Sequence, residues 1–88
     1  MPEIKLTITH EVGLHARPAS MFVQTAAKFS SDIEVTHGET TANAKSILAI
    51  LTLGAHQGAE LLISAEGADA DDALSALEEL VHNNFGED

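Results

Sequence analysis

Residues 60–84, ELLISAEGADADDALSALEELVHNN, contain the clearest signals for the fold of this chain. The short apolar segment Glu60–Glu66 ends at a glycine and predicts a β-strand. In the segment that follows, Ala73, Leu77 and Leu80 lie on one helical stripe, which predicts an amphipathic helix. A strand followed directly by a helix is therefore the last structural unit that the sequence predicts.

Acidic residues mark the start of this helix. Asp69 is the expected N-cap, because an aspartate at that position accepts a hydrogen bond from a free N–H group of the first turn. Asp71 and Asp72 follow, and their negative charges are favourable at the positive end of the helix dipole. The helix should therefore begin just after Asp69.

Similar periodicities divide the rest of the chain. Residues 4–8 alternate as in a half-buried strand, and residues 16–29 have the apolar spacing of an amphipathic helix. A strand carrying Ile33 and Val35 then leads through a turn at residues 37–39 into a short second strand.

The segment KSILAILTLG predicts a short helix, with Ser46 as its N-cap and Gly54 as its C-terminal stop. The complete order is βαββαβα, an α+β arrangement. Because alternate positions of the strands are polar, we expect an antiparallel sheet that is packed by helices on one face and solvated on the other.

The chain is short for a protein with an enclosed active site. Its 88 residues make one small domain, 1–88, whose chemistry should lie at the surface. It has no cysteine, which fits a reducing compartment. The amino terminus lacks the features of a secretory signal, and the longest apolar run, residues 47–51, is far shorter than the roughly 20 residues of a membrane helix. We therefore expect a cytoplasmic protein without membrane insertion.

The charge balance is strongly acidic. Fourteen Asp and Glu residues against four Lys and Arg residues give a formal net charge of −10. This balance argues against a nucleic-acid partner, because phosphate binding requires clustered basic side chains. The acidity fits a solvated surface, and adaptation to high salt remains open. Arg17 is set apart, because no acidic residue lies between Glu11 and Asp32.

The segment HEVGLHARPAS, residues 10–20, raises the question of a metal site. Its histidines have the spacing HExxxH instead of the HExxH of zinc proteases, and five residues along a helix turn them away from a shared face. Gly13 and Pro18 also argue against a helix interior. No phosphate-binding loop, dinucleotide-binding or nucleophile-elbow motif is present. We predict neither a metal nor a cofactor, and nothing supports a hydrolase.

What remains in this segment is a histidine at the entrance to a helix. Pro18 suits a first helical turn, so the helix should start between Ala16 and Pro18. Free N–H groups and the helix dipole favour an anion beside His15, and the guanidinium of Arg17 suits phosphate oxygens. A neutral imidazole is also a competent nucleophile toward phosphorus. These residues together predict a phosphohistidine site, with a simple polar helix cap as the alternative.

Three segments are shared with a known family: GLHARPAS at residues 13–20, AKSILAI at 44–50 and ISAEGADADDALSALEEL at 63–80. Over essentially its whole length the sequence resembles HPr, the histidine-containing phosphocarrier of the bacterial phosphoenolpyruvate:sugar phosphotransferase system. The resemblance implies an HPr-like open-faced β-sandwich with a four-stranded antiparallel sheet and three helices on one face. It also implies a carrier of phosphoryl groups and not an enzyme.

The resemblance assigns roles to individual residues. His15 matches the histidine that takes a phosphoryl group on Nδ1 from phosphorylated enzyme I and passes it to sugar-specific IIA proteins or domains. Arg17 matches the arginine that accompanies this histidine. Ser46, preceded by Lys45, matches the serine that a kinase phosphorylates in many Gram-positive relatives, so HPr kinase/phosphorylase is a further candidate partner.

The helix SILAILTL is apolar nearly all round, although a short surface helix should show one apolar stripe. Ile50 and Leu53 can face the core, but the remaining three large apolar residues cannot all do so, which predicts an exposed apolar patch. A deeply buried helix is the alternative. In HPr-like proteins this helix borders the phosphorylated histidine and docks partners. The predicted partner-binding residues are Ser20, Gln24, Lys45, Ile47, Leu48 and Leu51.

Two other functions remain open: a nitrogen-related regulatory HPr paralogue, and a non-catalytic regulatory binding module. Relatives often carry additional lysines where this chain has Gln24, Ala27 and Ala49, so partner recognition should depend more on the apolar patch. The histidines at positions 10, 37, 56 and 82 lack supporting residues and are expected to be plain surface residues. We expect a monomer.

Overall fold

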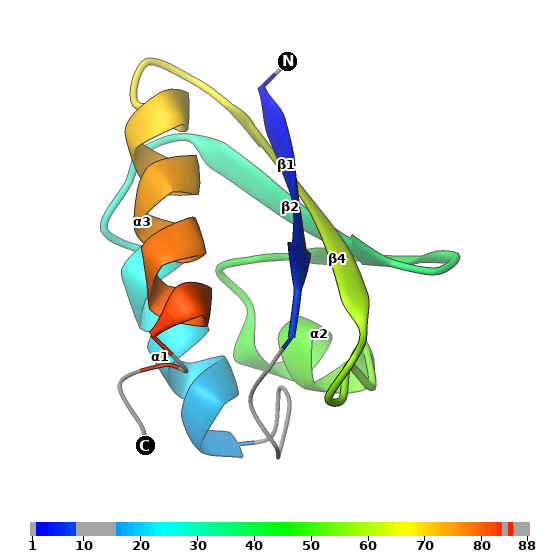
Figure 1. The fold of residues 1–88 in the computed structure, drawn as a ribbon. Coiled ribbons are helices and arrows are strands. Elements are labelled where there is room, and N and C mark those ends of the chain that lie inside the picture. Colours follow the sequence, from blue (N-terminus) through cyan, green and yellow to red (C-terminus); the bar gives the residue numbers. More distant parts are fainter. Residues whose placement is uncertain (1, 9–15, 84, 86–88) are drawn as a thin grey trace.

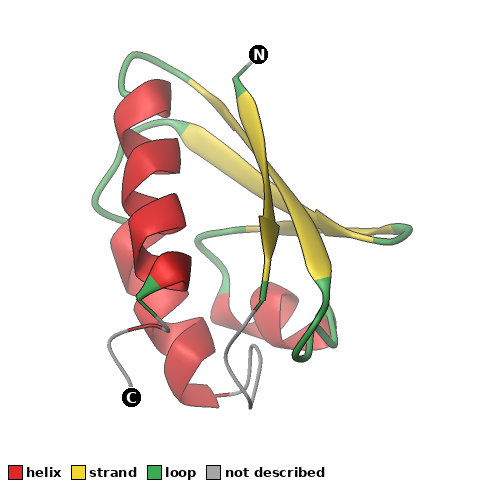
Figure 2. Ribbon diagram, viewed as in Figure 1, coloured by secondary structure: helices red, strands yellow, loops and turns green. Residues whose placement is uncertain are grey.

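The structure, a computed structural model, describes residues 2–8, 16–83 and 85. Its elements follow the predicted order βαββαβα, and the three helices cover one face of a four-stranded sheet (Figures 1 and 2). In chain order they are β1 (Glu3–Thr7), α1 (Ala16–Ala26), β2 (Asp32–His37), β3 (Thr40–Asn43), α2 (Ile47–Thr52), β4 (Glu60–Glu66) and α3 (Ala70–His82).

The sheet has the strand order β1-β4-β2-β3, and every neighbouring pair is antiparallel, as predicted. Register places apolar residues opposite one another on the face beneath the helices: Leu6 pairs with Leu61, and Val35 pairs with Ile63. All four are buried. Since side chains alternate across a strand, the intervening positions form the opposite, mostly polar face.

Helices α1 and α3 lie side by side and run in opposite directions over the sheet (Figure 1). The predicted helix at residues 16–29 is three residues too long, because α1 ends at Ala26. After that residue, the N–H groups of Lys28 and Phe29 donate to carbonyls three residues earlier, at 3.2 Å each. These tighter bonds close the last turn and end the helix.

No helix in the described ranges is long and apolar enough to cross a membrane; α3, with 13 residues, is the longest of them.

The start of α3 corrects one expectation. Asp69 occupies the N-cap position, but its side chain makes no capping hydrogen bond. Its carboxylate instead accepts hydrogen bonds from the loop between α1 and β2. The N–H of Ser30 donates to Oδ2 at 2.9 Å and the N–H of Ser31 donates to Oδ1 at 2.9 Å. Both hydroxyls also donate to this carboxylate, that of Ser30 at 3.4 Å. We call this set of contacts the Asp69 anchor.

The Asp69 anchor is tightly enclosed on the side of Ser31, which is buried. Gly67 approaches so closely that a Cβ atom there would lie 2.6 Å from Ser31 Oγ and 2.8 Å from Ser31 Cα. Hydrogen bonds to the ionised form stabilise a carboxylate. The hydroxyl of Ser31, followed by the N–H of Ser30, accordingly lowers the pKa of Asp69 to about 2.

Candidate functional site

The N-terminus of α1 is the part of the described structure closest in sequence to the predicted phosphoryl acceptor. His15 itself lies outside the described residues. The helix begins at Ala16, within the range that the position of Pro18 predicts. Its first turn contains no acidic residue, and the N–H groups of a first helical turn, which have no partner within the helix, favour an anion there.

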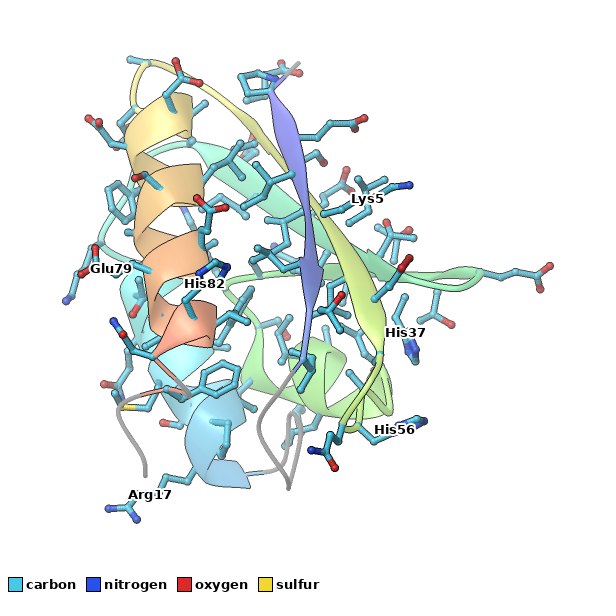
Figure 3. All side chains as sticks on the ribbon, viewed as in Figure 1. Lys5, Arg17, His37, His56, Glu79 and His82 are labelled. Carbon is cyan, nitrogen blue, oxygen red and sulfur yellow. The ribbon has the colours of Figure 1, made fainter. Side chains whose placement is uncertain are left out.

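Arg17 is the second residue of α1, and its side chain is exposed. Figure 3 shows the guanidinium extending away from the fold at the end of this helix. The opposite stripe of α1 holds the helix in place, because Ala19, Phe22 and Ala26 are fully buried. The core therefore fixes the rotation of α1, and this rotation directs Arg17 outward.

Ser20 and Gln24 continue the stripe of Arg17 along α1, at helical spacings of three and four residues. Ser20 is half-buried and Gln24 is exposed. The side-chain amide of Gln24 donates to the hydroxyl of Ser20 at 3.1 Å. These two predicted partner-binding residues therefore lie together on the outward side of the helix, and their polar groups are already oriented by one another.

Ser46 is the N-cap of α2, as the sequence predicts. Its Oγ accepts a hydrogen bond from the N–H of Ala49 at 3.3 Å, and its backbone is extended, with φ −110° and ψ 113°. At the other end of the helix, Gly54 follows with a φ of +65°, a left-handed conformation that suits glycine and stops the helix. Ser46 is half-buried at the start of this short helix.

Helix α2 divides its apolar residues between the core and the surface. Ile50 and Leu53 are buried. The other three large apolar residues, Ile47, Leu48 and Leu51, are exposed, and Leu48 is the most exposed of them at 74%. The predicted exposed patch is therefore present, and the alternative of a deeply buried helix is wrong.

One member of this surface was missed at the level of sequence. Met21 of α1 is also exposed, and α1 packs against α2. A signal for it was available, because Met21 lies four residues after Arg17, on the polar stripe of α1.

Every large hydrophobic side chain that is exposed within the described residues lies on α1 or α2. We call this surface the α1–α2 face; its members are Arg17, Ser20, Met21, Gln24, Ile47, Leu48 and Leu51.

Lys45 has a different position from the other predicted partner-binding residues. Its Nζ donates to the carbonyl oxygen of Phe29 at 2.7 Å, and its side chain is half-buried. The ammonium group thus joins the segment before α2 to the segment after α1. Its charge contributes to the electrostatic potential near the α1–α2 face, while its hydrogen bond has a structural role.

Comparison with known proteins identifies the family. A family model described as the PTS HPr component phosphorylation site matches residues 2–83. The chain belongs to the HPr family. HPr proteins are phosphocarriers of the phosphotransferase system, and they carry phosphoryl groups without acting as catalysts of a net reaction.

Solved HPr structures resemble this chain along nearly its full length. HPr-C-His from Thermoanaerobacter tengcongensis is 49% identical, with 100% of this chain and 99% of that chain covered and a TM-score of 0.97. The phosphocarrier protein HPr from Bacillus anthracis is 40% identical, with 91% and 95% covered and a TM-score of 0.88. The histidine-containing phosphocarrier protein of a mycoplasma is 38% identical, with 96% and 97% covered and a TM-score of 0.89. The open-faced sandwich of the HPr family is thus the fold of this chain.

Proposed function

We propose that this HPr accepts a phosphoryl group on His15 from phosphorylated enzyme I and passes it, as a cytoplasmic monomer, to sugar-specific IIA proteins or domains. The start of α1 is the observation that carries the proposal. His15 directly precedes Ala16, the first residue of the helix, and the exposed Arg17 follows. An anion at this helix start meets the positive end of the helix dipole, the guanidinium of Arg17 and no acidic residue in the first turn.

The chemistry needs one nucleophile and a positive environment. The neutral imidazole of His15 gives its Nδ1 lone pair to phosphorus, while the bond between phosphorus and the donor group of enzyme I breaks. In the second step the Nδ1–phosphorus bond breaks as a nucleophile of the IIA protein takes the phosphoryl group. Arg17 stabilises the charge on the transferring oxygens in both steps.

The α1–α2 face is the proposed docking surface for both kinds of partner. Apolar side chains such as Leu48 supply contact area, and Arg17 supplies a local positive charge in an otherwise acidic protein. Such a surface suits an association that must form and dissociate in every transfer cycle, because electrostatic complementarity mainly accelerates encounter. Tight binding to either partner would slow turnover.

Ser46 is the proposed regulatory position, phosphorylated by HPr kinase/phosphorylase where the source organism has that kinase. The two large side chains that follow it, Ile47 and Leu48, belong to the α1–α2 face. A phosphate on Ser46 would therefore add nearly two negative charges beside the docking surface. Partners that bind an apolar or positive surface would then associate less readily.

A phosphotransfer assay tests the proposed acceptor. The protein is incubated with phosphoenolpyruvate and cognate enzyme I, and the acid-labile label is mapped. The His15→Ala variant should lose all labelling, because no second histidine has the start of α1 and Arg17 beside it in the sequence. His82→Ala, at the end of α3, should label like the wild type. Labelling of another histidine in the His15→Ala variant would overturn the assignment.

The same assay separates the other two functions. A non-catalytic binding module would remain unlabelled in the wild type. A nitrogen-related paralogue would be labelled but would pass its phosphoryl group to a regulatory IIA-like protein in preference to the IIA domain of a sugar permease. Transfer to a sugar-specific IIA protein is the outcome that we expect.

A further inference from the structure

Two histidines that are distant in sequence lie next to each other at the end of β2. His37 is the last residue of β2 and is half-buried, and His56 lies exposed in the connection between α2 and β4. Their ring centroids are 6.4 Å apart, and the ring planes are almost perpendicular at 89° (Figure 3). His56 is exposed, as expected of a plain surface residue, whereas His37 is half-buried, and the sequence did not predict that the two rings lie together.

Each ring is oriented by a hydrogen bond from its Nδ1 atom. Nδ1 of His37 lies 2.9 Å from the carbonyl oxygen of Leu53, and Nδ1 of His56 lies 3.0 Å from the carbonyl oxygen of Gln57. A carbonyl oxygen can only accept, so Nδ1 must carry the proton in both rings. In the neutral imidazole the lone pair is then on Nε2.

This arrangement is typical of histidines that bind a metal ion. A metal-binding histidine almost always donates its second ring N–H to a carbonyl or carboxylate, which fixes the tautomer and the ring orientation. Here both rings already have that donor bond, with both Nε2 atoms left to act as ligands. We propose that His37 and His56 form a two-imidazole site for a divalent transition-metal ion.

The ligand set defines which ions fit. Imidazole nitrogens suit Cu²⁺, Ni²⁺ and Zn²⁺, with Cu²⁺ highest in the usual order of affinity, whereas Mg²⁺ and Ca²⁺ prefer oxygen ligands. Within the described residues, no group of three or more His, Cys, Asp and Glu side chains is placed to hold an ion. Water completes the coordination shell in this proposal, as in open metal sites.

The rings need a small adjustment to bind one ion. Zn–N bonds are about 2.0–2.1 Å long, so the two Nε2 atoms must converge on one point. His56 can make this movement, because its side chain is exposed. The half-buried His37, held by the carbonyl of Leu53 at the end of α2, is the fixed ligand of the pair.

Binding would connect the β2–β3 turn to the segment that follows α2. Because the unfolded chain does not hold these two rings together, an ion bound by both should stabilise the folded state. The site is separate from the proposed phosphoryl site at the start of α1, so its test does not depend on phosphotransfer.

Calorimetric titration with ZnCl₂ and CuCl₂ at pH 7.5 tests the proposal, with His37→Gln and His56→Gln as the variants. His82→Gln is the matched control, because His82 is also exposed and lies well apart on α3 (Figure 3). Each of the first two variants should lose at least about 10-fold in affinity for the ion, by analogy with the loss that follows removal of a supporting group. The control should bind as the wild type does. Equal binding by His37→Gln, His56→Gln and the wild type would overturn the site.

Nuclear magnetic resonance gives a second readout that does not require any variant to fold. Without metal, the ring nitrogens of His37 and His56 should show the tautomer with the proton on Nδ1. Substoichiometric Cu²⁺ should broaden the ring signals of both residues together, while those of His82 remain sharp. Broadening of only one of the pair, or Nε2-protonated rings in the metal-free protein, would contradict the proposal.

Discussion

The α1–α2 face runs along α1, the Asp69 anchor joins α3 to the segment after α1, and the two differ in what their side chains contact. On the α1–α2 face, large apolar groups and Arg17 remain exposed, an arrangement that contributes little to stability. In the Asp69 anchor, a carboxylate receives four hydrogen bonds from Ser30 and Ser31. If the α1–α2 face binds partners as proposed, binding and stability depend on separate regions, and single substitutions should affect one without the other.

The strongest test of this separation lies within α2, which contains two isoleucines in different surroundings. Ile50 is fully buried, whereas Ile47 is 38% exposed on the α1–α2 face. Ile50→Ala should lower the free energy of unfolding by about 2–5 kcal/mol through loss of burial and creation of a cavity. Ile47→Ala should lower it by about 1 kcal/mol or less, because less buried surface is lost.

Phosphotransfer from enzyme I should rank the same two variants in the opposite order. The assay is run well below the melting temperatures of both variants. Ile47→Ala should raise the apparent KM of enzyme I for this HPr, whereas Ile50→Ala should leave that KM close to the wild-type value. Urea denaturation supplies the stabilities. If the two variants had similar KM values, the proposed docking role of Ile47 would be wrong.

Substitution of Arg17 should give the next largest effect, and this effect should be confined to the rate of phosphoryl transfer. Arg17→Ala should slow phosphoryl transfer by on the order of 10²–10³, the usual value for one charge contact in a transition state. Its melting temperature should stay near that of the wild type, because the side chain is exposed. Arg17→Lys should recover only part of the rate, since an ammonium group cannot grip phosphate in the two-pronged manner of a guanidinium. Wild-type rates in Arg17→Ala would remove Arg17 from the site.

A substitution in the Asp69 anchor should instead lower stability and leave phosphoryl transfer unchanged. The loss of stability should depend on pH. The pKa of Asp69 is lowered to about 2 in the folded protein, from an ordinary value of 3.8. The folded state therefore releases this proton more readily than the unfolded state does. The stabilisation is complete above about pH 4 and is lost as the pH falls towards 2.

Asp69→Asn removes this effect, so its melting temperature should be lower than that of the wild type at pH 7, with the difference shrinking below pH 4. Asp71→Asn, which removes a carboxylate from the first turn of the same helix, is the matched control. Transfer at pH 7 should be unchanged in both variants at temperatures where they are folded. A constant difference in melting temperature between pH 7 and pH 2 would show that the carboxylate charge is not what stabilises the contact.

The elements of this fold could be predicted because their signals are local. The bounds of β4, the cap at Ser46 and the stop at Gly54 each depend on residues only a few positions apart. The division of α2 into buried and exposed residues was also predictable, because one short helix cannot bury all of its faces.

Contacts between distant segments were not predictable in the same way. Asp69 looked like a helix cap, because an aspartate before a helix usually is one; its actual partner, Ser31, lies 38 positions away. The bond from Lys45 to Phe29 and the pairing of His37 with His56 likewise depend on which strands and helices the fold brings together. On α1, the predicted partner-binding residues included Ser20 and Gln24 but not Met21, an exposed apolar residue among polar ones.

Ser46 gives the smallest expected change in stability and the finest test of the comparison, because its hydroxyl has both a structural and a proposed regulatory role. As N-cap it accepts a hydrogen bond from Ala49, so Ser46→Ala should lose roughly 1 kcal/mol of stability while keeping phosphotransfer. Ser46→Asp should keep the stability, because aspartate caps a helix as well as serine does. Its negative charge, however, lies beside Ile47 and Leu48 and should weaken acceptance of the phosphoryl group from enzyme I. Melting temperatures and enzyme I kinetics on both variants therefore separate the two roles: if Ser46→Asp transfers as well as the wild type, Ser46 is a helix cap without a regulatory function.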